Sequence, residues 1–310
     1  MNRLHQADST ISVLSLCALF GHSKQAYYKA WSYHCHERLK SSVILKIVEE
    51  IRRDMHHLGG RKLHQIVIER LPEDLFIGRD AFFNLLRDNG YLLRGRRSHP
   101  VTTNSYHHFH IYENLIQDFS PTAPHQLYVS DITYVDGPDG CFYYLSLITD
   151  AYSHKIVGWY LSETLEMKGP IEALKMALSK LPEGAKLIHH SDRGVQYCSG
   201  PYINLLKSVV NADIRISMTQ NGDPRENAIA ERVNGILKTE WINDMSFQSL
   251  EDARVRIKKV INLYNNERPH SSIQMMTPEQ ASHMQGPLER KWKSYYKKRE
   301  NKECNDGKYL

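Results

Sequence analysis

Three acidic residues occupy positions where a carboxylate could do chemistry. Asp131 lies within an otherwise apolar, β-rich run at 127–135, where a buried carboxylate is costly unless it is paired or binds a metal ion. Asp192 follows a short apolar run at 186–190, and ligands commonly gather where strands end. Glu231 lies on a predicted helix. Each acid also has a simpler explanation: an arginine partner for Asp131, a turn cap for Asp192 and plain solvation for Glu231.

Taken together, the three acids indicate metal-dependent chemistry. Carboxylate oxygens from two strands and one helix are hard ligands of the kind that Mg²⁺ prefers. A pair of such ions can activate an attacking water or 3′-hydroxyl and stabilise the leaving oxygen of a phosphodiester. The sequence therefore predicts that Asp131, Asp192 and Glu231 hold two Mg²⁺ or Mn²⁺ ions.

The helix that carries Glu231 has clear start signals. Asp223 can cap it, Pro224 suits its first position, and Glu226 completes a capping box. Apolar residues recur in one stripe, at Ile229, Val233, Ile236 and Leu237. The opposite face carries Asn227, Glu231, Asn234 and Lys238. The simplest interpretation of this polar face is a solvated surface, and only the two upstream aspartates favour a functional one.

The elements around these acids form a repeating pattern. Three consecutive strands are predicted at 127–135, 141–149 and 155–161. A helix at 166–180, a strand at 186–190, a helix at 202–210, a strand at 214–218 and the Glu231 helix follow. The order β-β-β-α-β-α-β-α predicts an α/β fold with a mixed five-stranded sheet flanked by helices. A further amphipathic helix is predicted at 249–264, capped by Ser249.

The N-terminal third is predicted to be all helical. Residues 11–31 have the outline of a helix-turn-helix, with a break at Gly21 and a cap at Ser23, although a plain helical hairpin fits equally well. Residues 41–93 predict three more helices, with one ending before Gly59, one at 61–70 and one at 79–87. They suit a DNA-binding module or a small helical bundle. Arg94, Arg96 and Arg97 follow directly and are candidate phosphate contacts.

The chain is long enough for two or three domains. We predict a helical DNA-binding region at 1–97, a linker at 98–123, the α/β catalytic core at 124–246, and a C-terminal helix with a basic tail at 247–310. The tail could follow a DNA backbone or be a solvated terminus. The linker carries His107, His108 and His110, but no acid or cysteine at a suitable spacing, so no metal site is predicted there.

Composition narrows the class of protein. Lys+Arg 40 against Asp+Glu 35 gives a net charge of +5, which is compatible with a polyanionic partner. The five cysteines are scattered without a CxxC pair, which argues against a disulfide framework or structural zinc and for a reducing compartment. The apolar run at 11–20 is too short to span a bilayer and lacks the features of a signal peptide. We therefore expect a cytoplasmic protein with no membrane partner.

Several motifs then occur in a fixed order. They are Ser130-Asp131-Ile132-Thr133-Tyr134, the run from His190 to Tyr197, Ser217-Met218 through Gly222-Asp223, the run from Glu226 to Glu231, Leu237-Lys238-Thr239-Glu240, the run from Tyr264 to His270, and Thr277-Pro278-Glu279. From about 90 to 270 the sequence resembles the OrfB-type transposases of the IS-three family of bacterial insertion sequences. These belong to the DDE transposase and retroviral integrase superfamily, whose catalytic core is ribonuclease H-like. The segment 41–93 is similar to the family's helix-turn-helix region.

The resemblance implies roles for these residues. It makes Asp131, Asp192 and Glu231 the metal-binding catalytic acids and places Lys238 against DNA. It implies a DNA transposase that nicks the ends of its element and joins the freed 3′-hydroxyls to DNA by hydrolysis and transesterification. The partners would be terminal inverted repeats and target DNA, a homo-oligomer on that DNA, and an upstream-frame helix-turn-helix protein. The location would be the bacterial cytoplasm, at the nucleoid.

The third acid of the resemblance has two candidates. The family has about 35 residues between the second and third acids, whereas Glu231 leaves 38 and Glu226 leaves 33. Spacing cannot choose between them. Helix geometry favours Glu231, because Glu226 fits the capping position and Glu231 shares a face with Lys238. The family usually has Trp where Tyr128 stands, which we interpret as a packing change.

Two alternative functions compete with the transposase. A domesticated relative could bind DNA without cutting it, but the intact acid triad argues against that. A ribonuclease H-like nuclease would lack strand transfer, and the helical N-terminal region and the motif at 264–270 favour a transposase. His189 and His190 flank the second acid, and we expect them to be core or supporting residues rather than ligands.

Overall fold

The structure, a computed structural model, describes residues 12–73, 75–93, 110–117, 119–220 and 224–288. Asp223, the three arginines at 94, 96 and 97 and the basic tail lie outside these residues. The chain divides into two compact units, Met1–His99 and Pro100–Leu310, which we call the N-terminal unit and the C-terminal unit. The finer domain boundaries stay a prediction.

The N-terminal unit is helical, as predicted. It contains α2 (Val13–Leu19), α3 (Lys24–Asp54), α4 (Gly60–Arg70) and α5 (Arg79–Asp88). Ser23 caps α3 by accepting a hydrogen bond from the backbone N–H of Ala26, as expected. One prediction was wrong: the helix that begins after Ser23 does not stop near Trp31 but extends to Asp54, a length of 31 residues. No glycine or proline occurs between 24 and 54, so nothing in this stretch interrupts the helix.

The C-terminal unit is built on a five-stranded sheet. Its strands are β1 (Leu127–Asp136), β2 (Phe142–Asp150), β3 (Ile156–Ser162), β4 (Lys186–Ser191) and β5 (Asp213–Met218), in the order β3-β2-β1-β4-β5. The first three strands pair antiparallel, while β4 runs parallel to both β1 and β5. This is the mixed sheet predicted for a ribonuclease H-like core.

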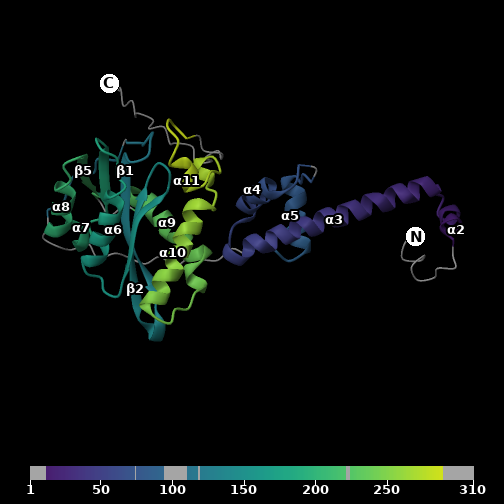
Figure 1. The fold of residues 1–310 in the computed structure, drawn as a ribbon, viewed down its shortest axis with the longest axis horizontal. Coiled ribbons are helices and arrows are strands. Elements are labelled where there is room, and N and C mark those ends of the chain that lie inside the picture. Colours follow the sequence, from purple (N-terminus) through teal and green to yellow (C-terminus); the bar gives the residue numbers. More distant parts are fainter. Residues whose placement is uncertain (1–11, 74, 94–109, 118, 221–223, 289–310) are drawn as a thin grey trace, which may run out of the picture. The chain divides into compact units, whose positions relative to one another are not determined.

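Helices cover both faces of the sheet (Figure 1). One face packs against α6 (Lys168–Leu178) and α8 (Gly200–Lys207), through a core that includes Tyr128, Leu174 and Leu206. The short helix α7 (Val195–Cys198) precedes α8. On the other face Leu127, Val129 and Ile188 form a second core with Ala230 of α9 (Ala228–Glu240). Because side chains alternate along a strand, odd-numbered residues of β1 point towards α9.

The start of α9 differs from the prediction. Residues Pro224–Asn227 form a turn of 3-10 helix, and α9 begins only at Ala228, with Asn227 at its N-cap and no side-chain cap. The capping box predicted between Asp223 and Glu226 lies partly outside the described residues. The Glu226 carboxylate accepts a hydrogen bond from the backbone N–H of Gln220 at 2.6 Å, and so contacts the loop after β5. This contact with Gln220 uses the carboxylate that the local pattern assigned to the start of the helix.

The remaining elements follow α9. After the 3-10 turn Ile242–Asp244 comes α10 (Leu250–Asn266), capped by Ser249 as predicted. Two short elements, a 3-10 turn at Ser271–Ile273 and α11 (Pro278–Ala281), complete the described chain. Earlier in the chain, the 3-10 turn Pro138–Gly140 joins β1 to β2. Within the described residues, no helix is long and apolar enough to cross a membrane.

Candidate active site

The first two acids lie side by side because of strand register. In the parallel pairing of β1 with β4, Ser130 stands opposite Ser191. Asp131 follows Ser130 and Asp192 follows Ser191, so the two acids lie at the same height, just past the last paired residues of β1 and β4. Asp131 shares its side of β1 with Leu127 and Val129 and therefore faces α9. The two acids are neighbours because of this strand register, which the sequence alone does not reveal.

Helix α9 contacts Asp131 through the face that carries Glu231. Asn234 Nδ2 donates a hydrogen bond to Asp131 Oδ2 at 2.6 Å, and Asn227 Nδ2 donates to the backbone oxygen of Ser130 at 3.0 Å. Both asparagines are only 5% exposed. The interpretation of this face as a solvated surface was therefore wrong for Asn227 and Asn234, although Glu231 between them is exposed. Their spacing around Glu231 was the available signal for two supporting residues that the sequence reasoning did not assign.

The three carboxylates interact electrostatically. Burial, and then the negative charge of Asp192, raises the pKa of Asp131 to about 7, and Glu231 adds a smaller effect in the same direction. Hydrogen bonds from Asn234 and the backbone of Ile132 oppose this rise in the pKa. Burial and Asp192 also raise the pKa of Glu231. All three acids thus share one region, in which burial and mutual repulsion disfavour the charged carboxylates.

This region suits a cation by its chemistry. Clustered carboxylates are hard oxygen donors, and a bound divalent ion would relieve the repulsion that raises their pKa values. Among the described residues, no three His, Cys, Asp or Glu side chains stand close enough together to form a preformed ligand set. Asp192 also has a local role, since its Oδ1 accepts a hydrogen bond from the backbone N–H of Gly194 at 2.9 Å. The acids therefore form an electrostatic cluster rather than a closed coordination sphere.

Lys238 lies one helical repeat beyond Asn234 on the same face of α9. Its side chain is half-buried, and burial lowers its pKa, while the carboxylates of Asp136 and Asp131 act in the opposite direction. Lys238 therefore lies beside the acidic cluster, because the carboxylates of both aspartates attract its ammonium group. The structure thus places Lys238 beside the acids, and its contact with DNA stays a prediction.

Comparison with known proteins identifies the family. Residues 121–224 and residues 212–278 match two family models described as an integrase core domain. The chain is 32% identical over 267 residues to an insertion element IS600 protein of 31 kDa from Shigella sonnei, covering 85% of this chain and 96% of that protein. It is 35% identical over 286 residues to the transposase InsF for insertion sequence IS3A from Escherichia coli K12, covering 89% and 95%. The chain belongs to the insertion-sequence transposases with an integrase core domain. The predicted resemblance and the enzyme class, a DDE-type transposase, are confirmed.

The transposase is less similar to proteins of solved structure than to these two relatives. The catalytic core domain of the HTLV-2 integrase in complex with magnesium is 19% identical, with a TM-score of 0.40, and covers 52% of this chain and 98% of that chain. A simian T-cell lymphotropic virus intasome chain is 16% identical, with a TM-score of 0.44, and covers 81% and 80%. At this level of similarity neither neighbour bears on the site.

The two histidines of the transposase beside Asp192 are core residues, as expected. His189 Nε2 shares hydrogen bonds with Ser130 Oγ at 3.2 Å and Tyr202 Oη at 2.8 Å, and His190 Nδ1 pairs with Ser217 Oγ at 2.9 Å. Burial lowers the pKa of His189 to about 3 and that of His190 to about 4, so both rings are neutral at physiological pH. They join β4 to β1, α8 and β5, and thereby support the strands that present the acids.

Proposed function

We propose that this transposase cleaves DNA at the ends of its element and joins the freed 3′-hydroxyls to target DNA, with Asp131, Asp192 and Glu231 as the catalytic acids. The observation that carries the proposal is the shared electrostatic cluster that β1, β4 and α9 form at these three residues. Glu226 has a different setting, because its carboxylate binds the backbone of Gln220. This contrast supports Glu231 as the third acid.

The proposed cofactor is a pair of Mg²⁺ or Mn²⁺ ions held by the three carboxylates. Bound there, the ions would supply activation of the attacking oxygen and charge neutralisation at the leaving oxygen. Asn234 would orient Asp131 and favour its charged form through the 2.6 Å hydrogen bond. Lys238 would hold a phosphate beside the scissile bond. Arg94, Arg96 and Arg97 remain candidate phosphate contacts outside the described residues.

Two displacements at phosphorus account for the reaction. In the first, the oxygen of water bonds to phosphorus, the bond to the 3′-oxygen breaks, and a 3′-hydroxyl is released. In the second, that hydroxyl bonds to the phosphorus of target DNA, and a strand of the target leaves with its own hydroxyl. Positioning and charge stabilisation suffice for such in-line steps, so no covalent protein nucleophile is needed. We further propose that the enzyme works as a homo-oligomer on paired terminal repeats, in the cytoplasm at the nucleoid, with an upstream-frame helix-turn-helix protein as partner.

The direct test uses labelled DNA that carries the terminal repeats of the element, incubated with Mg²⁺ or Mn²⁺. We expect nicked and joined products from the wild type and none from Asp192→Asn or Glu231→Gln. Glu226→Gln is the matched control, since it removes a nearby carboxylate of the same loop and helix region, and it should retain activity if the variant folds. Equal activity of wild type and Asp192→Asn would refute the catalytic role of the cluster. A greater loss from Glu226→Gln than from Glu231→Gln would reassign the third acid.

A further inference from the structure

Several side chains of the motif Tyr264–His270, at the end of α10, are buried in the C-terminal unit. Tyr264 and Arg268 are 0% exposed and His270 is 4% exposed. A fully buried guanidinium is costly unless it is paired with an acid and its N–H groups are hydrogen-bonded. The acid that pairs with Arg268 therefore identifies the element to which this motif is attached.

Arg268 binds the last residue of α9 with a two-pronged contact. Its Nη2 donates to Glu240 Oε1 at 2.6 Å and its Nε donates to Glu240 Oε2 at 2.8 Å. The remaining nitrogen, Nη1, donates to the backbone oxygen of Pro269 at 3.3 Å and pairs with His270 Nε2 at 2.9 Å. A planar guanidinium that holds both oxygens of a carboxylate fixes its direction as well as its distance. The end of α9 is thus fixed in orientation.

Glu240 lies on the side of α9 away from the active site. It follows Glu231 by nine residues, and nine steps of about 100° make about two and a half turns, which places the two side chains on opposite faces. On the Glu231 face, Asn234 binds Asp131. Contacts on two different sides of the helix, one from Asn234 to β1 and one from Glu240 to Arg268, together define the rotation of α9 about its axis. A rotation of the helix would move Glu231 and break at least one of them.

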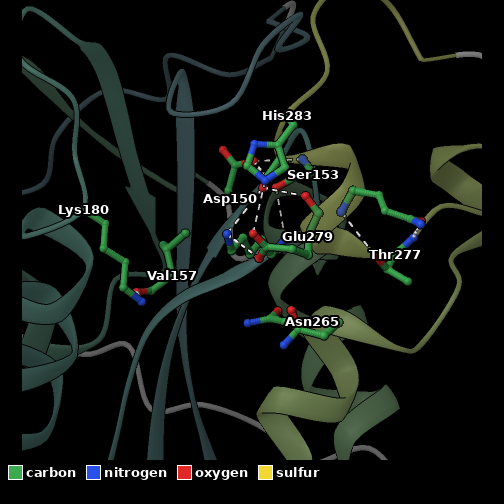
Figure 2. A network of polar contacts seen from close by, with 12 residues as sticks. Asp150, Ser153, Val157, Lys180, Asn265, Thr277, Glu279 and His283 are labelled. Atoms are coloured by element: carbon green, nitrogen blue, oxygen red, sulfur yellow. Dashed lines mark hydrogen bonds and ion pairs between the residues drawn. The ribbon is translucent and has the colours of Figure 1, made fainter.

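The motif that carries Arg268 is itself anchored to the sheet. The Asn265 side chain bonds both the backbone N–H and the backbone oxygen of Ile156, each at 3.0 Å, at the start of β3 (Figure 2). Tyr264 Oη donates to the backbone oxygen of His154 at 3.0 Å. Further along the chain, Lys155 Nζ forms an ion pair with Glu279 Oε2 at 2.6 Å. Arg268 therefore connects α9 to a segment that is held firmly against the end of the sheet.

We propose that Arg268 is a positioning residue of the active site, which sets the rotation of α9 through Glu240 and thereby places Glu231 beside Asp131 and Asp192. This inference rests on the proposed function, in which Glu231 is the third metal-binding acid. It gives the Tyr264–His270 motif a role in metal binding, although none of its side chains belongs to the acidic cluster.

The test measures Mn²⁺ binding to the full chain by electron paramagnetic resonance, at a temperature where circular dichroism shows each variant to be folded. Arg268→Lys keeps the charge and loses the two-pronged contact. We expect it to weaken Mn²⁺ binding about tenfold, at the low end of the effect of residues that orient metal ligands. In the Glu231→Gln background the same change should have no further effect, because the ligand that Arg268 places is already absent.

Glu279→Gln is the matched control. It weakens an ion pair that anchors the same segment to the sheet but does not touch α9, so it should lower the melting temperature and leave Mn²⁺ binding unchanged. If Arg268→Lys does not fold, Glu240→Gln carries the same test, since it keeps the shape of the side chain that Arg268 holds. Binding within twofold of the wild type in the folded variant, or equal weakening in the Glu231→Gln background, would overturn the inference alone. A wild type whose Mn²⁺ binding is absent, or unaffected by Asp192→Asn, would overturn the proposed function and this inference with it.

Discussion

Asn234 donates a hydrogen bond to Asp131 across the contact between α9 and β1, at 2.6 Å. This bond joins the helix that carries Glu231 to the strand that carries the first acid. It also lowers the pKa of Asp131, against the effects of burial and of Asp192. One amide group therefore both orients the carboxylate and favours the charged form that a metal ion needs.

Replacing Asn234 should thus impair catalysis without unfolding the protein. Asn234→Leu removes the donor at similar volume, so we expect a loss of about 10- to 100-fold in the rate of DNA cleavage at saturating metal. Cleavage of labelled terminal-repeat DNA measures the rate. Thr239→Ala is a suitable control, because it removes a hydrogen bond to the backbone of Gly235 on the same helix without contacting an acid. An Asn234→Leu variant as fast as Thr239→Ala would show that the bond is dispensable.

The raised pKa of Asp131 predicts an unusual pH dependence of stability in the absence of divalent metal. The folded-state pKa of about 7 lies above the ordinary value of 3.8, so the folded state binds more protons than the unfolded state between these limits. Ionisation of Asp131 then opposes folding: this destabilisation is absent below about pH 4 and complete above about pH 7. A shift of this size corresponds to at most about 4 kcal/mol, and partial solvent exposure reduces it to about 1–2 kcal/mol.

The variant Asp131→Asn isolates this effect. Measured in EDTA, its melting temperature should exceed that of the wild type at pH 8, and the difference should disappear towards pH 4.5. Adding Mg²⁺ at pH 8 should raise the melting temperature of the wild type and not that of the variant, because in the proposed site the ion binds the ionised carboxylate. A difference between the two proteins that is constant with pH would mean that Asp131 ionises normally.

Much of the fold follows from local sequence patterns. The five strands, the helices between them and the caps Ser23 and Ser249 are set by alternation, periodicity and capping chemistry. The pairing of Asp131 with Asp192 could be suspected because both residues interrupt or end an apolar strand. Its cause, the register of Ser130 against Ser191, is a tertiary property.

The parts that could not be predicted depend on contacts between distant residues. The hydrogen bond from the backbone of Gln220 to the Glu226 carboxylate spans the loop after β5, and the local capping pattern gives no sign of it. Arg268 and Glu240 are 28 residues apart, and no local pattern relates them. Asn234 looked like part of a solvated face because sequence periodicity shows which residues share a face, not what that face contacts.

Lys238 should contribute to DNA binding through a phosphate contact that weakens as the salt concentration rises. Its side chain lies beside the acidic cluster, where the carboxylates of Asp136 and Asp131 attract its ammonium group. Lys238→Gln should weaken binding of terminal-repeat DNA and reduce the slope of log affinity against log salt by about one, as expected for one lost phosphate contact. Fluorescence anisotropy at several salt concentrations gives both values. Lys175→Gln, on α6 at the other face of the sheet, should change neither, and equal effects from the two variants would remove Lys238 from the interface.

The packing of α6 on β3 depends on the absence of a side chain at Gly158. A Cβ at this residue would lie 2.1 Å from the backbone oxygen of Ala173, so an alanine forces the helix away from the strand. We expect Gly158→Ala to reduce the free energy of unfolding by about 3 kcal/mol. Gly235→Ala is the natural comparison, since Gly235 lies in α9, where a Cβ would meet no neighbouring atom within 4 Å. Alanine is the better helix former there and should stabilise the protein by about 0.5–1 kcal/mol. Urea unfolding followed by tryptophan fluorescence measures both changes. If Gly158→Ala unfolds at the same urea concentration as the wild type, helix α6 does not rest directly on the backbone of β3.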